Sequence, residues 1–272
     1  MDIFEGEIMK KVLASILAVT LLVSLVAGCG GKGKIKEKTD VYVFAAASMQ
    51  ATLEQISADY KKVEPNINLI FNFDSSGTLK TQIENGAECD IFISAAQKQM
   101  NALDALNMVD KSTRLNLLEN KVALVVPEGN PRNITSYNDL DTDKLELLAL
   151  GNDDVPVGAY AHEILGNMGI YDKLNAANKI TFATNVTEVA KQVKEGTVSA
   201  GVVYATDAST HGLKVVAEPP AGTLATPVIY PAAVMSATKH AEAAKNFLDY
   251  LQGDAAMKVF ESVGFANATA LK

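Results

Sequence analysis

Short apolar runs alternate with amphipathic segments along most of the chain, beginning near residue 41. The apolar runs are rich in Val, Ile, Leu and Phe, and they predict strands at residues 41–46, 68–73, 91–94, 121–126, 147–150, 180–183, 200–204 and 228–235. Apolar positions three or four residues apart predict helices at 53–63, 79–84, 96–107, 136–144, 239–251 and 254–262, and from Tyr160 and Thr187. This alternation favours open α/β sheets in which the strands run largely parallel.

Two stretches rich in Pro and Gly interrupt the alternation, at residues 127–131 and 218–223. Such clusters mark places where a chain changes direction. Because they enclose a middle α/β unit, the sequence predicts two lobes joined by two crossings, with the C-terminal part returning to the first lobe. We expect lobe 1 to comprise residues 40–121 and 227–272, and lobe 2 to comprise residues 122–226.

A basic segment followed by a long apolar run lies near the start of the chain. Two lysines precede residues 12–27, which contain no charged side chain, as in a secretory signal peptide. The run ends in Val-Ala-Gly-Cys at 26–29, which resembles the lipobox of bacterial lipoproteins. The resemblance implies a lipoprotein signal peptide at 1–29 and an extracytoplasmic protein anchored to the cell membrane by a diacylglycerol on Cys29. A single transmembrane anchor is the alternative, although the run is shorter than the roughly 20 residues that a span prefers.

The residues on either side of this run also carry information. Acidic residues at positions 2, 5 and 7 are unusual before a signal core, so we expect translation to start at Met9. The segment 30–39 is rich in Gly and Lys and predicts a flexible tether.

Acylation of Cys29 would leave Cys89 as the remaining cysteine, so we expect no intramolecular disulfide. Cys89 adjoins an apolar run and is predicted to be buried as a small hydrophobe.

The composition excludes several functional classes. The chain has 272 residues, of which 48% are hydrophobic and 21% charged, which is typical of a globular protein. With 24 Lys and Arg against 32 Asp and Glu, the net charge is -8, so we expect no nucleic-acid partner. Two Cys and three His without a CxxC pair do not suit a zinc site. A GxSxG elbow, a P-loop and a nucleophile with an identifiable His base are also missing, so binding without turnover is favoured over an enzyme.

Five loops at the predicted carboxyl ends of strands share one character. Open α/β folds bind ligands in the crevice outside these ends. Each loop combines small residues, hydroxyl groups and the start of a helix, at residues 45–48, 74–78, 155–160, 184–187 and 204–207. Backbone N–H groups at helix N-termini lack partners within the helix and favour anions. The sequence therefore predicts a site for a small, fully deprotonated anion. The alternative is that each Ser or Thr caps its own helix, as Ser48 is placed to do.

Seven short segments carry a family resemblance, in order, over nearly all of residues 40–265. They read VFAAAS at 43–48, DSSGTL at 74–79, QIE at 82–84, CDIFISA at 89–95, PVGAYA at 156–161, GVVYATDA at 201–208 and YPAAV at 230–234. Together they closely resemble the molybdate-binding proteins of ABC importers, the ModA family. The resemblance implies a type II periplasmic-binding-protein fold, in which two α/β lobes joined by two hinge crossings close on the ligand. It also implies binding of molybdate or tungstate and delivery of the anion to an ABC permease with its ATPase.

The resemblance further assigns the ligand contacts, residue by residue. Ser48 and Ser76 would each give a hydroxyl and a backbone N–H group, Val157 and Val186 their backbone N–H groups, and Tyr204 its phenol. All are uncharged donors, which suits molybdate because it has no proton to give, whereas phosphate usually has one. No cofactor and no metal-cation ligand are implied, and the protein is expected to be a monomer.

Two residues depart from the family's pattern, and several alternatives remain open. Asp74 stands where a small residue is usual, and Gly77 replaces a third Ser. An inward Asp74 carboxylate would repel a dianion and favour phosphate, but we expect it to point away or to accept from loop amides. Asp207, one turn after Tyr204, is interpreted as a helix cap, with contact to the ligand as the less favoured alternative. The alternative functions are a sulfate or phosphate receptor on the same fold, a secreted hydrolase, and a lipid-tethered adhesion or sensory module.

Overall fold

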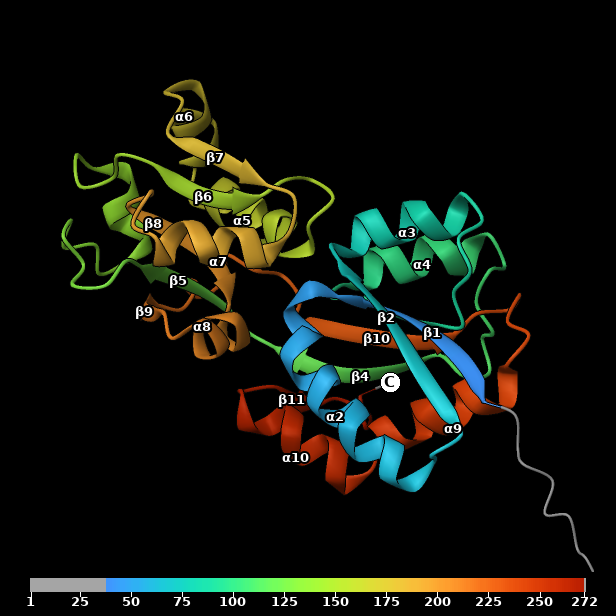
Figure 1. Ribbon diagram of the computed structural model, residues 1–272. Coiled ribbons are helices and arrows are strands. Elements are labelled where there is room, and N and C mark those ends of the chain that lie inside the picture. The colour runs from blue at the N-terminus through green and yellow to red at the C-terminus, as the bar shows by residue number, and fades with distance from the viewer. Residues whose placement is uncertain (1–37, 272) are drawn as a thin grey trace, which may run out of the picture. The chain divides into compact units, whose positions relative to one another are not determined.

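The structure is a computed structural model that describes residues 38–271. The predicted signal peptide, Cys29 and residues 30–37 of the predicted tether lie outside the described residues. From Lys38 onward the chain forms one compact unit, which contains two β-sheets (Figure 1). None of the described helices is long and apolar enough to cross a membrane.

The first sheet has six strands in the order β11-β4-β10-β3-β1-β2. These strands are β1 (Thr39–Ala46), β2 (Ile67–Asp74), β3 (Ile91–Ile93), β4 (Leu115–Asn120), β10 (Val228–Val234) and β11 (Ala266–Asn267). Strand β1 lies between β3 and the edge strand β2 and is parallel to both, whereas β10 is antiparallel to β3 and β4. Helices follow the carboxyl ends of β1 and β2, so residues after these two strands meet at one edge of the sheet.

Helices cover both faces of the first sheet. One face carries α3 (Ser76–Glu84) and α4 (Gln97–Ala105), and the other carries α2 (Gln50–Val63), α9 (Ala241–Leu251) and α10 (Asp254–Ser262) (Figure 1). Side chains alternate along β1, so that Val43 packs with Leu53 and Phe247, whereas Phe44 packs with the smaller cluster under α3 and α4. Burial on both faces explains why β1 reads as a continuous apolar run in the sequence.

The second sheet has five strands in the order β7-β6-β8-β5-β9. They are β5 (Val122–Val126), β6 (Leu148–Gly151), β7 (Ile180–Ala183), β8 (Ala200–Tyr204) and β9 (Lys214–Ala217). The helices of this part are α5 (Pro156–Asn167), α6 (Tyr171–Ala176), α7 (Val186–Lys194) and α8 (Ala205–His211). As in the first sheet, helices start just after the carboxyl ends of parallel strands.

Two segments connect the sheets. β4 passes into β5 at Lys121, and residues 218–227 lead from β9 back to β10. Two α/β sheets joined twice in this way confirm the predicted fold class. The exact limits of the two predicted lobes stay a prediction.

The expectation that the strands run largely parallel is wrong. Of the nine strand pairings in the described residues, four are parallel and five are antiparallel. The antiparallel pairs involve the strands that enter a sheet from a crossing, β5 and β10, and the strands beside them. Such strands are not fed by a helical crossover, so they are free to run opposite to their neighbours.

The predicted helix at 136–144 is also wrong. Only a 3₁₀ turn, η2 (Tyr137–Asp141), forms there. Ser136 and Asp139 make a capping box that starts the turn, but Thr142 already has an extended backbone. The Asp139 carboxylate also accepts from the Thr135 hydroxyl at 2.9 Å, so the polar side chains of this segment bind the local backbone and hydroxyls rather than extend a helix.

Several element limits differ from the prediction. Helix α3 begins at Ser76 rather than Leu79, and α5 begins at Pro156 rather than Tyr160. Polar residues and glycine in these first turns hide the spacing of apolar residues that predicts a helix. The Pro that begins α5 is a signal that the prediction did not use, since Pro is a favoured first helical residue. The pattern gave no strand or helix for β4, α6 and β9. Each of these elements is short, and polar residues interrupt its apolar positions.

Candidate functional site

The five predicted ligand residues lie at or beside the starts of helices that follow strands. Ser48 is in the 3₁₀ turn η1 (Ala47–Met49) after β1, and Ser76 is the first residue of α3 after β2. Val157 is the second residue of α5, Val186 is the first of α7, and Tyr204 is the N-cap residue of α8. First-turn N–H groups have no acceptor within their own helix, so these positions suit an anion.

Ser48 does not cap the helix that follows it, which corrects the prediction from its position. The N-cap residue of α2 is Met49, and no side-chain hydrogen bond caps that helix. The turn η1 comes between β1 and α2, and Ser48 Oγ lies 2.9 Å from Tyr230 Oη instead. The Ser48 hydroxyl is therefore directed toward β10 rather than toward the start of α2.

The contact between Ser48 and Tyr230 is part of a larger hydrogen-bond network. Asn120 Oδ1 accepts from the backbone N–H of Lys121 at 2.8 Å, which fixes the amide so that Nδ2 is the donor. Nδ2 donates to Tyr230 Oη at 3.1 Å and to Thr206 Oγ1 at 2.8 Å. Tyr230 Oη accepts from Asn120, and in its contact with Ser48 either hydroxyl can be the donor. When Tyr230 is the donor, the Ser48 proton is available to a ligand.

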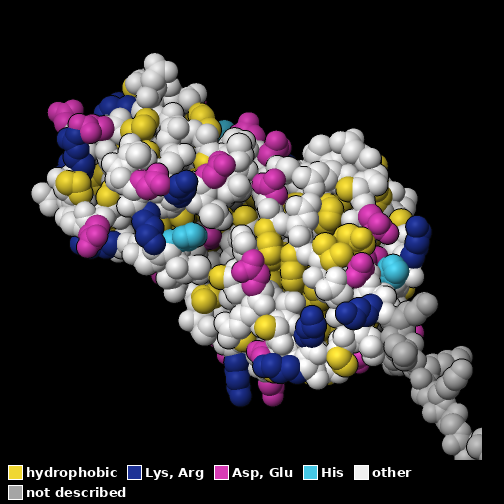
Figure 2. Space-filling view, in the orientation of Figure 1, with side chains coloured by type: hydrophobic (Ala, Val, Ile, Leu, Met, Phe, Trp, Pro, Cys, Tyr) yellow, Lys and Arg dark blue, Asp and Glu magenta, His cyan; other side chains and the backbone are white. Residues whose placement is uncertain are grey.

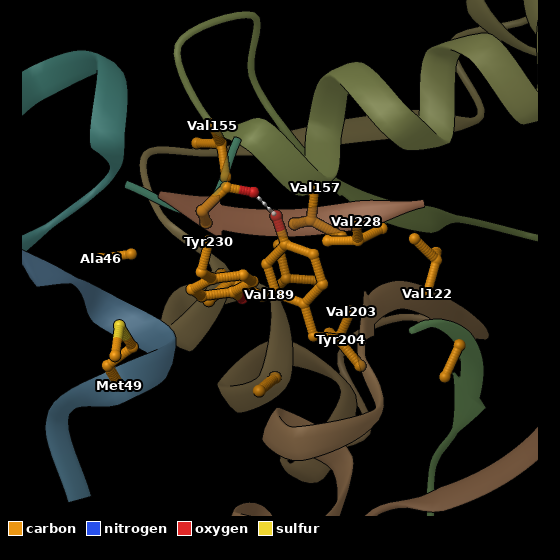
Figure 3. Close-up of a cluster of buried hydrophobic side chains, with 14 of the residues drawn as sticks. Ala46, Met49, Val122, Val155, Val157, Val189, Val203, Tyr204, Val228 and Tyr230 are labelled. Atoms are coloured by element: carbon orange, nitrogen blue, oxygen red, sulfur yellow. Dashed lines mark hydrogen bonds between the residues drawn. The ribbon is translucent and has the colours of Figure 1, made fainter. Parts of the chain in front are cut away.

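Tyr204 is a buried donor that reaches from the second sheet to the first. Its ring packs edge-to-face against that of Tyr230, with ring centroids 5.6 Å apart. Its hydroxyl donates to the Ala95 carbonyl at 3.4 Å, shown as a dashed line in Figure 3. Burial raises the pKa of Tyr204 well above its ordinary value, so the phenol keeps its proton at neutral pH. A hydrogen bond this long is weak, so a ligand oxygen can take over the proton.

Ser76 contacts the same residue, Ala95, through the backbone N–H. Ser76 is fully buried, and its Oγ accepts from the N–H of Ala95 at 2.9 Å. Since the hydroxyl oxygen is the acceptor in that bond, its proton remains available to a ligand. The adjacent Ser75 has a different role, because its Oγ caps α3 by accepting from the backbone N–H of Thr78 at 3.1 Å.

Gly77 brings the start of α3 against a loop of the second sheet. Its backbone N–H donates to the Asp154 carbonyl at 3.0 Å. A Cβ at this position would lie 2.3 Å from the same oxygen, which is too close for any side chain. The departure from Ser to Gly is thus explained by a close approach of two backbones.

Val157 and Val186 are buried, so only their backbone groups are candidates for ligand contact. Figure 3 places the Val157 side chain beside Tyr204. Asn185 caps α7 by accepting from the N–H of Glu188 at 3.0 Å, which leaves the N–H of Val186 without a partner within the helix. Thr187, the next residue, lines a cavity together with Ser48.

That cavity, of about 250 Å³, adjoins the predicted site. Among the described residues no Lys or Arg lines it, and its walls are mostly small or hydroxyl-bearing. Its ionisable residues are Glu54, Asp207 and His211. Glu54 is exposed and accepts from Gln50 Nε2 at 2.9 Å, so its charge is at the solvent side. An anion bound here would be held by neutral dipoles rather than by a cation.

Asp74 and Asp207 behave differently from each other. Asp74 Oδ1 accepts from the backbone N–H of Ser75 at 2.7 Å, which confirms the expectation that it accepts from a loop amide. Asp207 lies within the first turn of α8, and the N-cap residue of that helix is Tyr204. Hydrogen bonds from the backbone of Tyr204 and Asp207 lower its pKa, but burial raises it more. The interpretation of Asp207 as the helix cap is wrong, because Tyr204 holds the N-cap position and no side-chain hydrogen bond caps α8.

Sequence reasoning did not identify three residues that hold the site together. Tyr230, Asn120 and Ala95 connect Ser48, Tyr204 and Ser76 through the hydrogen bonds and the ring contact described above. Tyr230 lay within a segment that carries the family resemblance, so its sequence signal was present. Asn120 ends a strand that the hydrophobic pattern did not predict, and Ala95 contributes only its backbone.

We expect Tyr230→Phe to lower the free energy of unfolding by about 1 to 3 kcal/mol, because it leaves a buried Asn120 N–H without an acceptor. Tyr60→Phe is the matched control, since the Tyr60 hydroxyl is buried and has no partner in the described residues. Urea unfolding of both variants checks this. Equal stability of the two variants would show that the Asn120 to Tyr230 bond contributes nothing.

Charge on the molecular surface gives no sign of a polyanion site. On the face shown in Figure 2, Lys and Arg are interspersed with Asp and Glu and do not gather into one basic patch.

Cys89 is buried and makes a hydrogen bond through its thiol to the Ile91 carbonyl at 3.2 Å, as expected for an inert small hydrophobe. Burial also raises the pKa of the Cys89 thiol, which disfavours a nucleophilic role.

The fold and the site together define an ABC-transporter solute-binding protein. The chain belongs to the family of bacterial extracellular solute-binding proteins, whose family model matches residues 41–266, and within it to the ModA type. The family description places it outside the cytoplasm.

Known relatives support this assignment over nearly the whole chain. YvgL of Bacillus subtilis is 38% identical over 261 residues, covering 94% of this chain and 98% of YvgL. The molybdate-binding protein ModA of Haemophilus influenzae is 35% identical over 247 residues, covering 89% of this chain and 95% of the relative. The solved periplasmic molybdate-binding protein of Azotobacter vinelandii has the same fold, with a TM-score of 0.74 and 23% identity over 83% of this chain and 98% of that one.

Proposed function

We propose that this protein binds molybdate, and also tungstate, in the crevice between its two sheets and delivers the anion to an ABC permease. The ligand residues are Ser48, Ser76, Val157, Val186 and Tyr204. Each would bind oxygen atoms of the anion, and none would bind a metal cation. The protein would act by binding alone, without catalytic turnover.

One observation carries the proposal: uncharged hydrogen-bond donors from both sheets, buried or partly buried, lie near one another, and no described Lys or Arg lines the adjoining cavity. The Ser76 proton is not used by the contact that holds its oxygen, and the Ser48 hydroxyl can act as donor or acceptor in its contact with Tyr230. The Tyr204 proton is engaged in a long bond to the Ala95 carbonyl. A dianion without protons needs donors and no acceptors, which matches this set.

Closure of the crevice would couple binding to transport. Ser48 and Ser76 belong to the first sheet's part of the chain, and Val157, Val186 and Tyr204 belong to the second sheet's part. An anion that binds ligand residues of both parts at once favours the arrangement in which the two parts are close together. Binding thereby shifts the population toward a closed form. The permease would recognise that form. We also retain the predicted lobes, 40–121 with 227–272 and 122–226, as the moving bodies.

Membrane anchoring through Cys29 remains part of the proposal. A diacylglycerol there would hold a monomeric receptor beside its permease. The residues concerned lie outside the described part of the chain, so this step rests on the lipobox resemblance. Mass spectrometry of the mature protein, with Cys29→Ala as control, tests it.

Calorimetry with four oxyanions tests the ligand. We expect the compact unit from Lys38 onward to bind one molybdate or one tungstate per chain, and to bind sulfate and phosphate more weakly. The metal–oxygen bonds of molybdate and tungstate are longer than the bonds of sulfate and phosphate. Donors from both parts of the protein can therefore reach the oxygens of the larger anions at once, whereas the smaller anions span the distance between the donors less well. Binding of sulfate or phosphate without molybdate would assign a different ligand to the same fold. Hydrolytic turnover, or a protein partner without anion affinity, would remove the proposal altogether.

A further inference from the structure

Asp207, whose carboxyl group is buried, lines the cavity of Ser48 and has no role in the ligand contacts described so far. Asp207 is 2% exposed and lines the cavity together with Ser48 and Thr187. Its Oδ2 atom has no hydrogen-bond partner among the described residues. Buried polar atoms without partners are rare in native proteins, so this one calls for an explanation.

The surroundings of Asp207 keep it neutral. Burial raises the pKa of Asp207 from 3.8 to about 8, against the effect of the backbone hydrogen bonds. The ionisable groups on neighbouring elements are Tyr204 at the start of α8, Tyr230 on β10, Tyr160 on α5, Glu54 on α2, His211 on α8 and Lys194 on α7. The tyrosines keep their protons, Glu54 is exposed, and Lys194 lies near His211, whose pKa is lowered chiefly by burial. No described cation forms an ion pair with Asp207.

We propose that Asp207 is a sixth ligand residue of the anion site. Its carboxyl group is protonated and donates the Oδ2 proton to the bound oxyanion. This inference rests on the proposed function. A neutral carboxyl adds a donor to a site built of neutral donors, and it gives the unpartnered Oδ2 a partner in the bound state. An ionised carboxylate in the same cavity would repel a dianion, so the anion selects the protonated form.

Anion affinity must then depend on one proton. Molybdate carries no proton in the alkaline range, so the dependence comes from the protein. When only the protonated form binds, affinity is constant below the pKa of Asp207 and falls about tenfold per pH unit above it. Between pH 7.0 and 9.5 the dissociation constant should rise on the order of 30-fold. Tyr160, with a pKa raised to about 12, and the more deeply buried Tyr204 and Tyr230 keep their protons throughout this range.

The same group affects stability without any ligand. The folded-state pKa lies above the ordinary 3.8, so between about pH 4 and 8 the unfolded chain holds fewer protons at this group than the folded chain. Stability from Asp207 is therefore fully present below this range and is lost as the pH rises through it. Asp207→Asn cannot ionise and should remove this dependence.

Calorimetric titration with molybdate at pH 7.0 and 9.5 tests the proposal. The wild-type protein should lose affinity about 30-fold, whereas D207N, whose amide can still donate, should bind within a few-fold of the wild type at pH 7.0 and show no such fall. D207A should bind more weakly at both pH values. Glu54→Gln is the matched control, because it removes the exposed carboxylate of the same cavity and should leave the wild-type pH slope unchanged.

Several outcomes would overturn the proposal. One is a dissociation constant of the wild-type protein that is equal at pH 7.0 and 9.5. Another is a loss of affinity in D207N between these pH values that is as large as the loss in the wild type. If D207N does not fold, proton uptake by the wild type at pH 8.5, measured in two buffers of different ionisation enthalpy, decides instead: uptake of most of one proton supports the proposal and none overturns it. Absence of molybdate binding even at pH 7.0 would overturn the proposed function and this inference with it.

Discussion

Replacing Gly77 by alanine should weaken molybdate binding by roughly 5- to 150-fold while both sheets remain folded. A Cβ at Gly77 would lie 2.3 Å from the Asp154 carbonyl oxygen and 2.8 Å from the Asp154 Cα atom. These are backbone atoms, so no side-chain rotation relieves the overlap. Gly77 is the second residue of α3, beside the first sheet, and Asp154 follows β6 of the second, so the added methyl group separates loops that must meet around the anion. Overpacking of this kind costs about 1 to 3 kcal/mol.

The matched control for this substitution is Gly166→Ala. Gly166 lies in α5, has no atom near the position of an added Cβ, and should tolerate alanine with unchanged affinity. Calorimetry gives the two dissociation constants, and small-angle scattering with and without molybdate reports whether the variant still becomes more compact. Wild-type affinity in Gly77→Ala would show that the Gly77 to Asp154 contact is not part of the bound form.

A strand buried on both faces was among the elements that the sequence predicted best. The run 200–204 matches β8 residue for residue, because covering both faces leaves an uninterrupted apolar run. The run 180–183 also matches β7, although Phe182 in that edge strand is exposed. β4 was missed because Asn116 and Glu119 interrupt its apolar positions, although Leu117 and Leu118 are fully buried. Strand direction was mispredicted for a different reason: local periodicity carries no information on which way a strand enters a sheet.

The candidate site was predictable to the extent that its chemistry is local. Small residues and hydroxyls before a helix mark Ser48 and Ser76 from the sequence. Their roles were not predictable, since Ser48 is oriented by Tyr230, which is 182 residues away along the chain. The unpartnered Oδ2 of Asp207 is likewise invisible in the sequence, where an acidic residue in a first turn looks like an ordinary helix cap.

We expect Ser76→Ala to weaken molybdate binding by about 1.5 to 3 kcal/mol, which is about 10- to 150-fold in the dissociation constant. Ser76 is fully buried, so no water can replace its hydroxyl as a donor to the anion. The substitution also leaves the N–H of Ala95 without the acceptor that it has at 2.9 Å, and this should lower the free energy of unfolding by about 1 to 3 kcal/mol. Calorimetry and urea unfolding measure the two effects.

The neighbouring serine separates a ligand role from a helix role. Ser75 caps α3 by accepting from the backbone N–H of Thr78, so Ser75→Ala should cost about 0.5 to 2 kcal/mol of stability. The affinity of this variant for molybdate should stay near that of the wild type. The Ser75 hydroxyl is already engaged with both the backbone N–H and the hydroxyl of Thr78, so we expect it not to bind the anion. The two variants therefore share a loss of stability and differ in affinity. If both lose affinity equally, the binding defect comes from a loosened α3 and Ser76 is not a direct ligand of the anion.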